Sequence, residues 1–228
     1  MRRTILCVVL GALIIMVTPA AAYAALVAEW KMDETGGSTM VDSATGVGGA
    51  NNGTISGGVE IGREGLAGGR AYEFDGSTGF VSVPDNPSLD PGAASITLSA
   101  VVRVVDAPMS DDSYDLIRKG VTTTPGGDWK MEIKRTSNPS VGKLLCVFKG
   151  TGGAVQQSAN RDLVDGNVHR VQCIKTGNSV TAVVDGVRSS KNASAGSIAN
   201  DQPVVLGSKV AGDDVLRGVM DQATVSIG

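Results

Sequence analysis

The stretch Arg70-Ala-Tyr-Glu-Phe-Asp-Gly-Ser-Thr-Gly-Phe-Val-Ser-Val-Pro84 decides the fold class of this chain. Tyr72 and Phe74 alternate with polar residues, and Val81 and Val83 do so again after a Gly-rich break. A period of two is typical of β-strands that bury one face, and glycine supplies the positive φ angles of a tight reversal. The stretch therefore predicts a β-hairpin with one buried face.

The rest of the chain repeats this pattern of short alternating runs separated by Gly, Asn and Asp turns. The final pair of strands, separated by Lys175-Thr-Gly-Asn178, is the best-defined hairpin. Many short strands with such turns favour an all-β sandwich over a helical or mixed fold. Besides the opening stretch, the predicted strands are 26–32, 95–105, 114–119, 129–133, 144–148, 169–174 and 179–184.

The first 24 residues have the composition of an export signal. Basic residues Arg2 and Arg3 precede an apolar run over 4–22, and Ala22-Tyr23-Ala24 has the small-x-small pattern that signal peptidase reads. We therefore expect cleavage before Ala25.

Cleavage would divide the chain into a signal peptide, 1–24, and one folded domain, 25–228. The alternative is a retained membrane anchor, because the apolar run is about long enough to span a bilayer. The cluster of small residues at the end of the run favours cleavage. We expect a secreted protein that contacts the membrane only through its signal peptide before cleavage.

The charge of the exported chain narrows the classes of partner. Without Arg2 and Arg3, the 20 basic residues become 18, against 23 acidic residues. An acidic chain without a Lys/Arg cluster is a poor nucleic-acid binder, so we expect no nucleic-acid partner. A length of about 200 residues suits one sandwich with a substantial core.

Two cysteines, Cys146 and Cys173, remain once Cys7 leaves with the signal peptide. Pairing is the default for two cysteines in an exported chain, and two unrelated buried thiols are the alternative. Side chains two positions apart in a strand share a face, and each cysteine shares its face with apolar residues. We predict a disulfide between Cys146 and Cys173 that joins neighbouring strands of one sheet.

The order of these motifs resembles the laminin-G-like jelly-roll domains of the concanavalin A-like lectin and glucanase superfamily. The resemblance implies an antiparallel jelly roll of two sheets. Because this fold hosts enzymes, lectins and adhesion modules, the resemblance does not decide the ligand. The matching pieces span nearly all of the exported chain: Leu26-Val-Ala-Glu-Trp-Lys-Met-Asp-Glu-Thr35, Asp42-Ser-Ala-Thr-Gly46, Asn51-Asn-Gly-Thr54, Tyr72-Glu-Phe-Asp-Gly76, Val81-Ser-Val-Pro84, Asp165-Gly-Asn-Val-His169, Val183-Val-Asp-Gly186 and Val219-Met-Asp-Gln222.

The resemblance also implies a structural calcium ion, because relatives often hold calcium between early loops and an acid near the final strand. The residues in these places are Asp33, Asp42, Asn51 and Asp221, which offer the oxygen ligands that calcium prefers. On spacing alone, turn capping by Asp33 and Asp42 is the favoured alternative. Gln222 replaces a glutamate that often follows in relatives, which lowers the charge of the expected site.

The sequence offers no recognisable catalytic set. His169 is the single histidine, and no nucleophile or orienting acid can be assigned to it; in relatives, a histidine after such an Asp-Gly turn packs within the sandwich. Glycoside hydrolysis needs two carboxylates across the sugar, but Glu73 and Glu132 each stand alone in their predicted strands. We therefore expect a protein that is not an enzyme.

Two hypotheses remain for the function, a carbohydrate-binding module and an extracellular protein-interaction or structural module without a sugar site. Sugar binding often uses aromatic platforms, for which Tyr114 and Trp129 are the candidates. At its spacing Trp129 also fits a core position. The resemblance places glycan binding slightly ahead, so the expected partner is an extracellular glycan, with an extracellular protein as the alternative.

Overall fold

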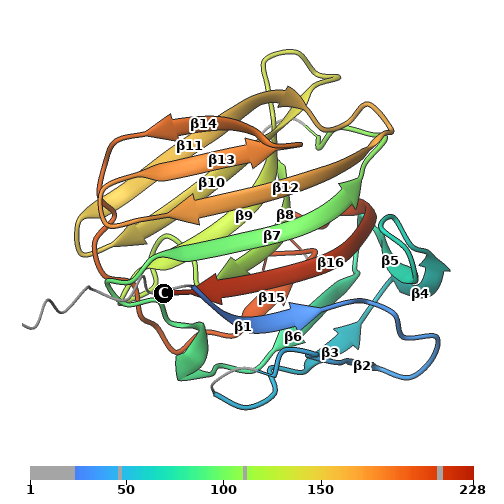
Figure 1. Ribbon diagram of the computed structural model, residues 1–228. Helices are drawn as coiled ribbons and strands as arrows, with labels where there is room; N and C mark the ends of the chain where they lie inside the picture. Colours follow the sequence, from blue (N-terminus) through green and yellow to red (C-terminus); the bar gives the residue numbers. More distant parts are fainter. Residues whose placement is uncertain (1–23, 46–47, 110–111, 210–212) are drawn as a thin grey trace, which may run out of the picture.

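The computed structural model describes residues 24–45, 48–109, 112–209 and 213–228. Apart from Ala24, the predicted signal peptide lies outside the described residues. The described chain forms two antiparallel eight-stranded sheets packed face to face (Figure 1). The all-β, two-sheet jelly-roll sandwich expected from the sequence is therefore confirmed.

The front sheet has β1 and β16, the first and last strands, side by side (Figure 1). Its strands run in the order β14-β13-β12-β7-β16-β5-β4, and β1 pairs with β16 beyond the end of β5. These strands are β1 (Ala25–Trp30), β4 (Val59–Glu64), β5 (Arg70–Asp75), β7 (Ile96–Arg103), β12 (Val168–Lys175), β13 (Val180–Val184), β14 (Val187–Lys191) and β16 (Arg217–Ile227).

The back sheet follows the order β11-β10-β9-β8-β15-β6-β3-β2. A 3-10 turn, η1 (Pro87–Leu89), lies in the connection from β6 to β7. The strands of this sheet are β2 (Thr39–Met40), β3 (Gly53–Ser56), β6 (Phe80–Val83), β8 (Ser113–Lys119), β9 (Asp128–Arg135), β10 (Gly142–Gly150), β11 (Gly153–Asp162) and β15 (Val204–Leu206).

The core lies between the sheets and is filled by the apolar residues of each alternating strand. Alternation sends every second side chain inward, so each strand contributes one row of apolar residues. The aromatic residues Trp30, Tyr72, Phe74, Trp129 and Phe148 are all fully buried in this layer. In the part of the chain that the structure describes, no helix is long and apolar enough to cross a membrane.

The opening stretch of the sequence analysis is not a hairpin, which corrects the prediction. β5 pairs with β4 and β16 in the front sheet, whereas β6 pairs with β3 and β15 in the back sheet. The turn between them crosses the sandwich, and the carboxylate of Asp75 accepts hydrogen bonds from the backbone N–H groups of Ser77, Thr78 and Gly79. Both strands direct their apolar side chains into the same core. Their alternation of apolar and polar residues is therefore the same as in the two strands of a hairpin.

The last predicted hairpin is present as β12 and β13, and it continues into β14. The turn from β13 to β14 uses Asp185 at φ 49° and Gly186 at φ 81°. Two successive residues with positive φ are typical of the two-residue turn that matches the twist of a hairpin.

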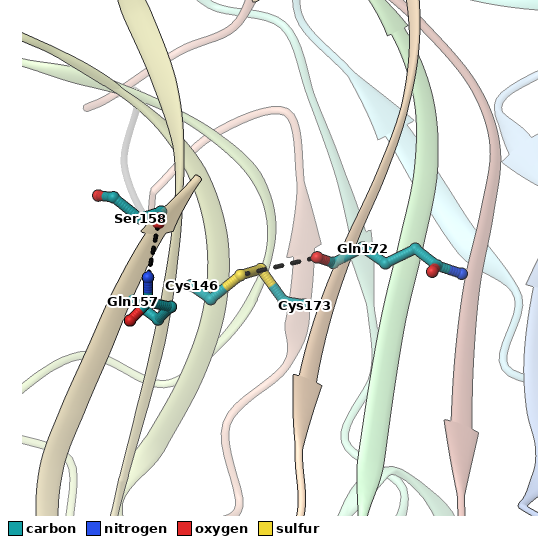
Figure 2. The surroundings of a disulfide bond; sticks show 5 residues. All are labelled: Cys146, Gln157, Ser158, Gln172 and Cys173. Atoms are coloured by element: carbon teal, nitrogen blue, oxygen red, sulfur yellow. Dashed lines mark hydrogen bonds between the residues drawn. A yellow bond between two sulfur atoms is a disulfide. The ribbon is translucent and has the colours of Figure 1, made fainter. Parts of the chain in front are cut away.

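The disulfide between Cys146 and Cys173 is present, with the two Cα atoms 5.3 Å apart. It joins β10 of the back sheet to β12 of the front sheet and not two strands of one sheet (Figure 2). The prediction that the disulfide joins neighbouring strands of one sheet is therefore wrong. A cysteine that faces the core can also pair with a cysteine of the opposite sheet. Stacked sheets usually lie about 10 Å apart, so the sheets come unusually close here, beside the small buried residue Ala182, which lies opposite Cys173.

Candidate ligand-binding site on the front sheet

The outer face of the front sheet carries a hollow of about 500 Å³, here called the first hollow. Its floor includes Val101 of β7 and Val183 of β13, whose side chains are buried. Its walls are polar because the outward positions of β1, β7, β12 and β16 carry polar residues. The polar lining residues are Glu29, Lys31, Asp33, Ser99, Arg170, Gln172, Gln222 and Thr224.

The polar groups of the first hollow offer both hydrogen-bond donors and acceptors. Gln172 donates to Ser99 Oγ at 3.3 Å, and the Lys31 ammonium lies 3.9 Å from the Glu29 carboxylate. Arg170 is exposed on β12 beside them. Among the described residues that line this hollow, none is aromatic. The arrangement suits a ligand rich in hydroxyl groups that is held by hydrogen bonds, not by ring stacking.

A second hollow of about 430 Å³ lies on the same face, at the other end of β7 and β16. Arg63 bridges its acidic wall with ion pairs of 2.8 Å to Glu73 and 3.2 Å to Glu60. Arg217 lies 3.5 Å from Asp106 at the opposite side. These side chains are partly exposed, so their charges remain accessible to a ligand.

The two predicted aromatic platforms lie in different environments. The ring of Trp129 is 0% exposed in the core, so its predicted role as a platform is wrong. Tyr114 keeps 9% of its surface exposed and borders a separate hollow near Asp106 and Arg217. Side chains alternate along β9, so Trp129 points into the core together with Met131 and Ile133. The core position that the spacing of Trp129 also allowed is therefore the correct one.

The four predicted calcium ligands lie as two pairs. In the first pair, Asp42 accepts hydrogen bonds from the backbone N–H groups of Glu29, Ala44 and Asn51 at 2.8 to 2.9 Å. The Asn51 side chain donates to the Val27 carbonyl, while its Oδ1 is buried without a partner. Asp42 therefore fixes its own turn and the neighbouring strand, as the capping alternative expects.

The second pair surrounds the loop between β4 and β5. Asp221 Oδ2 accepts hydrogen bonds of 3.0 Å from the N–H groups of Leu66 and Ala67, and Asp33 accepts one of 2.7 Å from Arg70. Burial raises the pKa of Asp221, and these N–H groups oppose that rise while the negative charge of Asp33 adds to it. A β-bulge follows Asp221, with Gln222 at φ 50°.

The second pair fits a cation better than the first, because its unpartnered buried oxygen, Asp221 Oδ1, belongs to a carboxylate. In the first pair both oxygens of Asp42 accept hydrogen bonds, and the unpartnered oxygen belongs to the neutral amide of Asn51. Within the described ranges, no three Asp, Glu, His or Cys side chains are grouped so that they could hold a metal ion. Backbone carbonyls or water would have to complete any site at Asp33 and Asp221. Calcium binding therefore stays a prediction, confined to this pair.

His169 has a structural environment. Its Nδ1 lies 2.8 Å from Asp185 and its Nε2 lies 3.0 Å from Asp165, so the ring joins the turns that flank β12 and β13. The side chain is 1% exposed. Both ring nitrogens are occupied, which leaves none to activate a nucleophile.

A pair of carboxylates on one strand was missed by the sequence analysis. Because β9 begins at Asp128, Asp128 and Glu132 share its outer face, and Asp115 of β8 lies opposite Glu132. Burial raises the pKa of Asp115 to about 7 although Arg118 opposes the rise. Glu132 therefore does not stand alone in its strand, which corrects the prediction.

These carboxylates are closed to a substrate. Asp115, Asp128 and Glu132 are at most 3% exposed, and ion pairs with Arg118 and Lys130 hold Asp115 and Glu132. A glycosidase needs its acid pair on either side of an accessible glycosidic bond. The buried cluster gives no support to hydrolysis.

The residues of the first hollow were visible in the sequence only as the outward positions of predicted strands. Ser99 and Gln172 alternate with the core residues of the predicted strands that contain them, and the structure places both in the first hollow. Their meeting depends on the pairing of β7 with β12, in which Gln172 lies opposite Ser99. Local pattern carries no information on that pairing, because it joins residues 73 positions apart.

Comparisons with solved structures give the same fold at low sequence identity. Domain 4 of AbnA, a GH43 extracellular arabinanase from Geobacillus stearothermophilus solved with arabinotriose, has 16% identity and a TM-score of 0.65, covering 90% of this chain and 93% of that chain. The binding domain of Paraclostridial Mosquitocidal Protein 1 has 16% identity and a TM-score of 0.66 over 89% of this chain and 48% of that one.

A third structure belongs to botulinum neurotoxin type C, whose cell entry depends upon interaction with two ganglioside molecules. It has 11% identity and a TM-score of 0.63, covering 89% of this chain and 47% of that chain. This chain thus spans about half the length of the two toxin chains.

No curated protein sequence matches the chain. A family model, described as concanavalin A-like lectin/glucanases superfamily, matches residues 75–226, which is more than half of the chain. The match includes β6 to β15 and nearly all of β16, and the two-sheet sandwich agrees with it. The chain belongs to the concanavalin A-like lectin/glucanases superfamily.

Proposed function

We propose that this protein is a secreted, non-catalytic carbohydrate-binding module whose ligand lies in the first hollow. The observation that carries the proposal is the hollow itself, about 500 Å³ in volume with a valine floor and polar walls. Its volume lies in the range of small-molecule sites, about 300 to 1,000 Å³. Neighbours of the same fold that were solved with arabinotriose or depend on gangliosides support a glycan as the ligand.

The non-catalytic part of the proposal rests on accessibility. The acids of β8 and β9 are buried, and both ring nitrogens of His169 are held by carboxylates. Export is supported by the disulfide, which persists in oxidising compartments.

We also propose a structural calcium ion held by Asp33 and Asp221. The free, buried Oδ1 of Asp221 supports it, and calcium bound there would fix the loop between β4 and β5 against β16. Asp33 also lines the first hollow, so the ion would hold one wall of the ligand site.

The test is a glycan array followed by calorimetry with the best ligand, on the wild type and on Gln172→Ala. Gln172 lines the first hollow, and removing its amide should weaken binding by about tenfold. Gln156→Ala is the matched control, because Gln156 is exposed on β11 of the back sheet.

Silence across neutral and charged glycans would overturn the proposal and favour a protein partner. Equal losses in Gln172→Ala and Gln156→Ala would place the sugar somewhere other than the first hollow.

A further inference from the structure

We propose that the side chains of Lys119 and Asp90 form an intramolecular amide bond, an isopeptide cross-link. Lys119 is the last residue of β8, and Asp90 caps the end of η1 in the connection from β6 to β7. The Lys119 Nζ lies 2.7 Å from Asp90 Oδ1. The two residues are 29 positions apart, so the bond would tie this connection to the back sheet. Neither residue lines the first hollow, and the inference is independent of the ligand.

Lys119 is fully buried, which is rare for a lysine. Its side chain is 0% exposed, and its position lies opposite Trp129 of β9 and Val204 of β15, which are also fully buried. Residues opposite each other in paired strands share a face of the sheet, so Lys119 lies in an apolar layer. The ammonium group at the end of the side chain is therefore shielded from water.

Two carboxylates meet this one ammonium group. Besides Asp90, Asp85 has its Oδ1 2.8 Å from Lys119 Nζ, and Nζ also donates to the carbonyl of Asn200. The backbone N–H of Asn200 donates to Asp90 Oδ1 at 3.2 Å. The side chain of Asp90 is 19% exposed and that of Asp85 is 35% exposed. Asp90 is thus the more enclosed acid, and Asp85 is the one nearer to water.

The exclusion of water favours a reaction between Lys119 and Asp90. Charged groups lose hydration energy when they are buried, and their mutual attraction does not always restore it. Transfer of one proton from the ammonium to the carboxylate gives a neutral amine beside a neutral acid, and neutral groups cost less to bury than ions. The neutral amine is a nucleophile held against the carboxyl group. In well-oriented intramolecular reactions, such proximity reaches effective concentrations of about 10⁵ to 10⁸ M.

The step balances without a further reactant. The Lys119 nitrogen attacks Asp90 Cγ, while the Asn200 N–H stabilises the negative charge that develops on Oδ1. Asp85 accepts one proton from the nitrogen and returns it to the departing hydroxyl group. A C–N bond forms, a C–O bond breaks and one water molecule leaves. The carboxylate that remains, Asp85, is the more exposed of the two.

Lys209 offers a comparison within the same chain. Its Nζ lies 2.6 Å from Asp213 and 3.7 Å from Asp214, so this lysine also meets two carboxylates. The side chain of Lys209 is 35% exposed and that of Asp213 is 58% exposed. Because water reaches these groups, they stay ionised and hydrated. We expect no amide bond at Lys209.

The test is mass spectrometry of the denatured and reduced protein. The wild-type mass should be lower than that of the exported sequence by one water molecule. After tryptic digestion, peptide 71–103 should be joined to peptide 119–130, because trypsin does not cleave after an acylated lysine. Fragmentation of the joined peptides should place the link between Asp90 and Lys119. The joined peptides also distinguish the cross-link from water loss within a single peptide.

Lys119→Met removes the amine and should restore the full mass. Asp85→Asn keeps both reacting groups but removes the proton acceptor, so the fraction of joined peptides in freshly purified protein should fall at least about tenfold. Lys209→Met is the matched control and should leave that fraction unchanged.

A wild-type protein of full mass without joined peptides overturns the inference and leaves Lys119 in an ion pair. A link that maps to Asp85 overturns the assignment of Asp90 as the reacting acid. The wild type and Asp85→Asn decide the question even when Lys119→Met does not fold.

Discussion

At the scale of single residues, His169 combines burial with two carboxylate partners. Burial lowers its pKa, but hydrogen bonds and charge from Asp185 and Asp165 raise the pKa above the usual 6.5. The folded state therefore holds the proton more tightly than the unfolded state. Stability from this cluster is fully present below about pH 6.5 and is lost as the pH rises through the raised pKa of the folded state.

We predict that His169→Gln costs roughly 1 to 3 kcal/mol at about pH 5.5 and less at about pH 9. Asp165 and Asp185 lose their shared donor in the variant, although Arg161 stays 3.3 Å from Asp185. Urea unfolding at a series of pH values measures the difference. An equal cost at both ends of the series would show that protonation of His169 does not matter.

The same carboxylates also set a lower pH limit to the stability that this cluster contributes. Hydrogen bonds from Asn167 and His169 lower the pKa of Asp165, and the pKa of Asp185 is lowered by His169 and Arg170 against the opposing effect of burial. Their contribution is present above the ordinary carboxyl pKa and is lost as the pH falls through the lowered values. The cluster is thus most stabilising between about pH 4 and pH 6.5.

Trp129 gives a second prediction at this scale. Its ring is buried and its Nε1 has no hydrogen-bond partner, so Trp129→Phe removes a costly polar group along with part of the ring. We expect a loss of about 1 to 2 kcal/mol in the free energy of unfolding and no change in glycan affinity. Loss of binding at unchanged stability would restore the ring as a ligand contact.

At the scale of the elements, the sequence defined the strands better than their partners. Alternation assigned Tyr72, Phe74, Val81 and Val83 to the core correctly. It could not show that β5 and β6 belong to different sheets, because every core-facing strand has the same period. The predicted boundary of β9 also had a consequence. The predicted strand began at Trp129, whereas β9 begins at Asp128, so the prediction left Asp128 out of the outer face of the strand.

The candidate site was less predictable than the fold for a physical reason. A hollow on a sheet depends on which outward side chains meet across strands, and β7, β12 and β16 are brought together by non-local pairing. The predicted aromatic residues were identified by residue type alone. The spacing of Trp129 with Met131 and Ile133 indicated a core position, and the structure buries all three residues.

The disulfide gives a prediction at this scale. The bridge joins residues 27 positions apart, so removing it should cost about 3 to 4 kcal/mol in the chain-entropy model. The double variant Cys146→Ser/Cys173→Ser and the reduced wild type should unfold at similar, lower urea concentrations. Wild-type stability that does not respond to dithiothreitol would contradict the pairing.

The loop between β4 and β5 gives a further prediction. Added calcium should raise the melting temperature over that in EDTA, since a hundredfold excess over Kd is worth about 2.7 kcal/mol. Asp221→Asn keeps an acceptor for Leu66 and Ala67 but removes the charge, so it should abolish the shift.

Asp42→Asn is the comparison for this experiment. Asp42 already accepts three backbone hydrogen bonds, so its variant should melt lower but keep the calcium shift. A melting temperature that ignores calcium in the wild type would remove the ion from the description.

At the scale of the whole molecule, β1 begins at Ala25, the residue predicted to follow signal cleavage. We expect the exported protein to have Ala25 at its amino terminus and a mass that lacks two hydrogens for the disulfide. Intact mass spectrometry under non-reducing conditions checks both. A retained apolar segment would instead indicate a membrane anchor.

The pairing of β1 with β16 also has a mechanical consequence. Ala25 lies opposite Ile227, so the amino-terminal end of the domain and its carboxyl end leave the sheet side by side (Figure 1). A force that pulls the two ends apart acts perpendicular to β1 and β16. It therefore breaks the backbone hydrogen bonds between these two strands one after another, starting at Ala25 and Ile227. Tethered at both ends, this sandwich should open like a zipper from β1 under weak tension, while the cross-sheet disulfide keeps the far end of the sandwich closed.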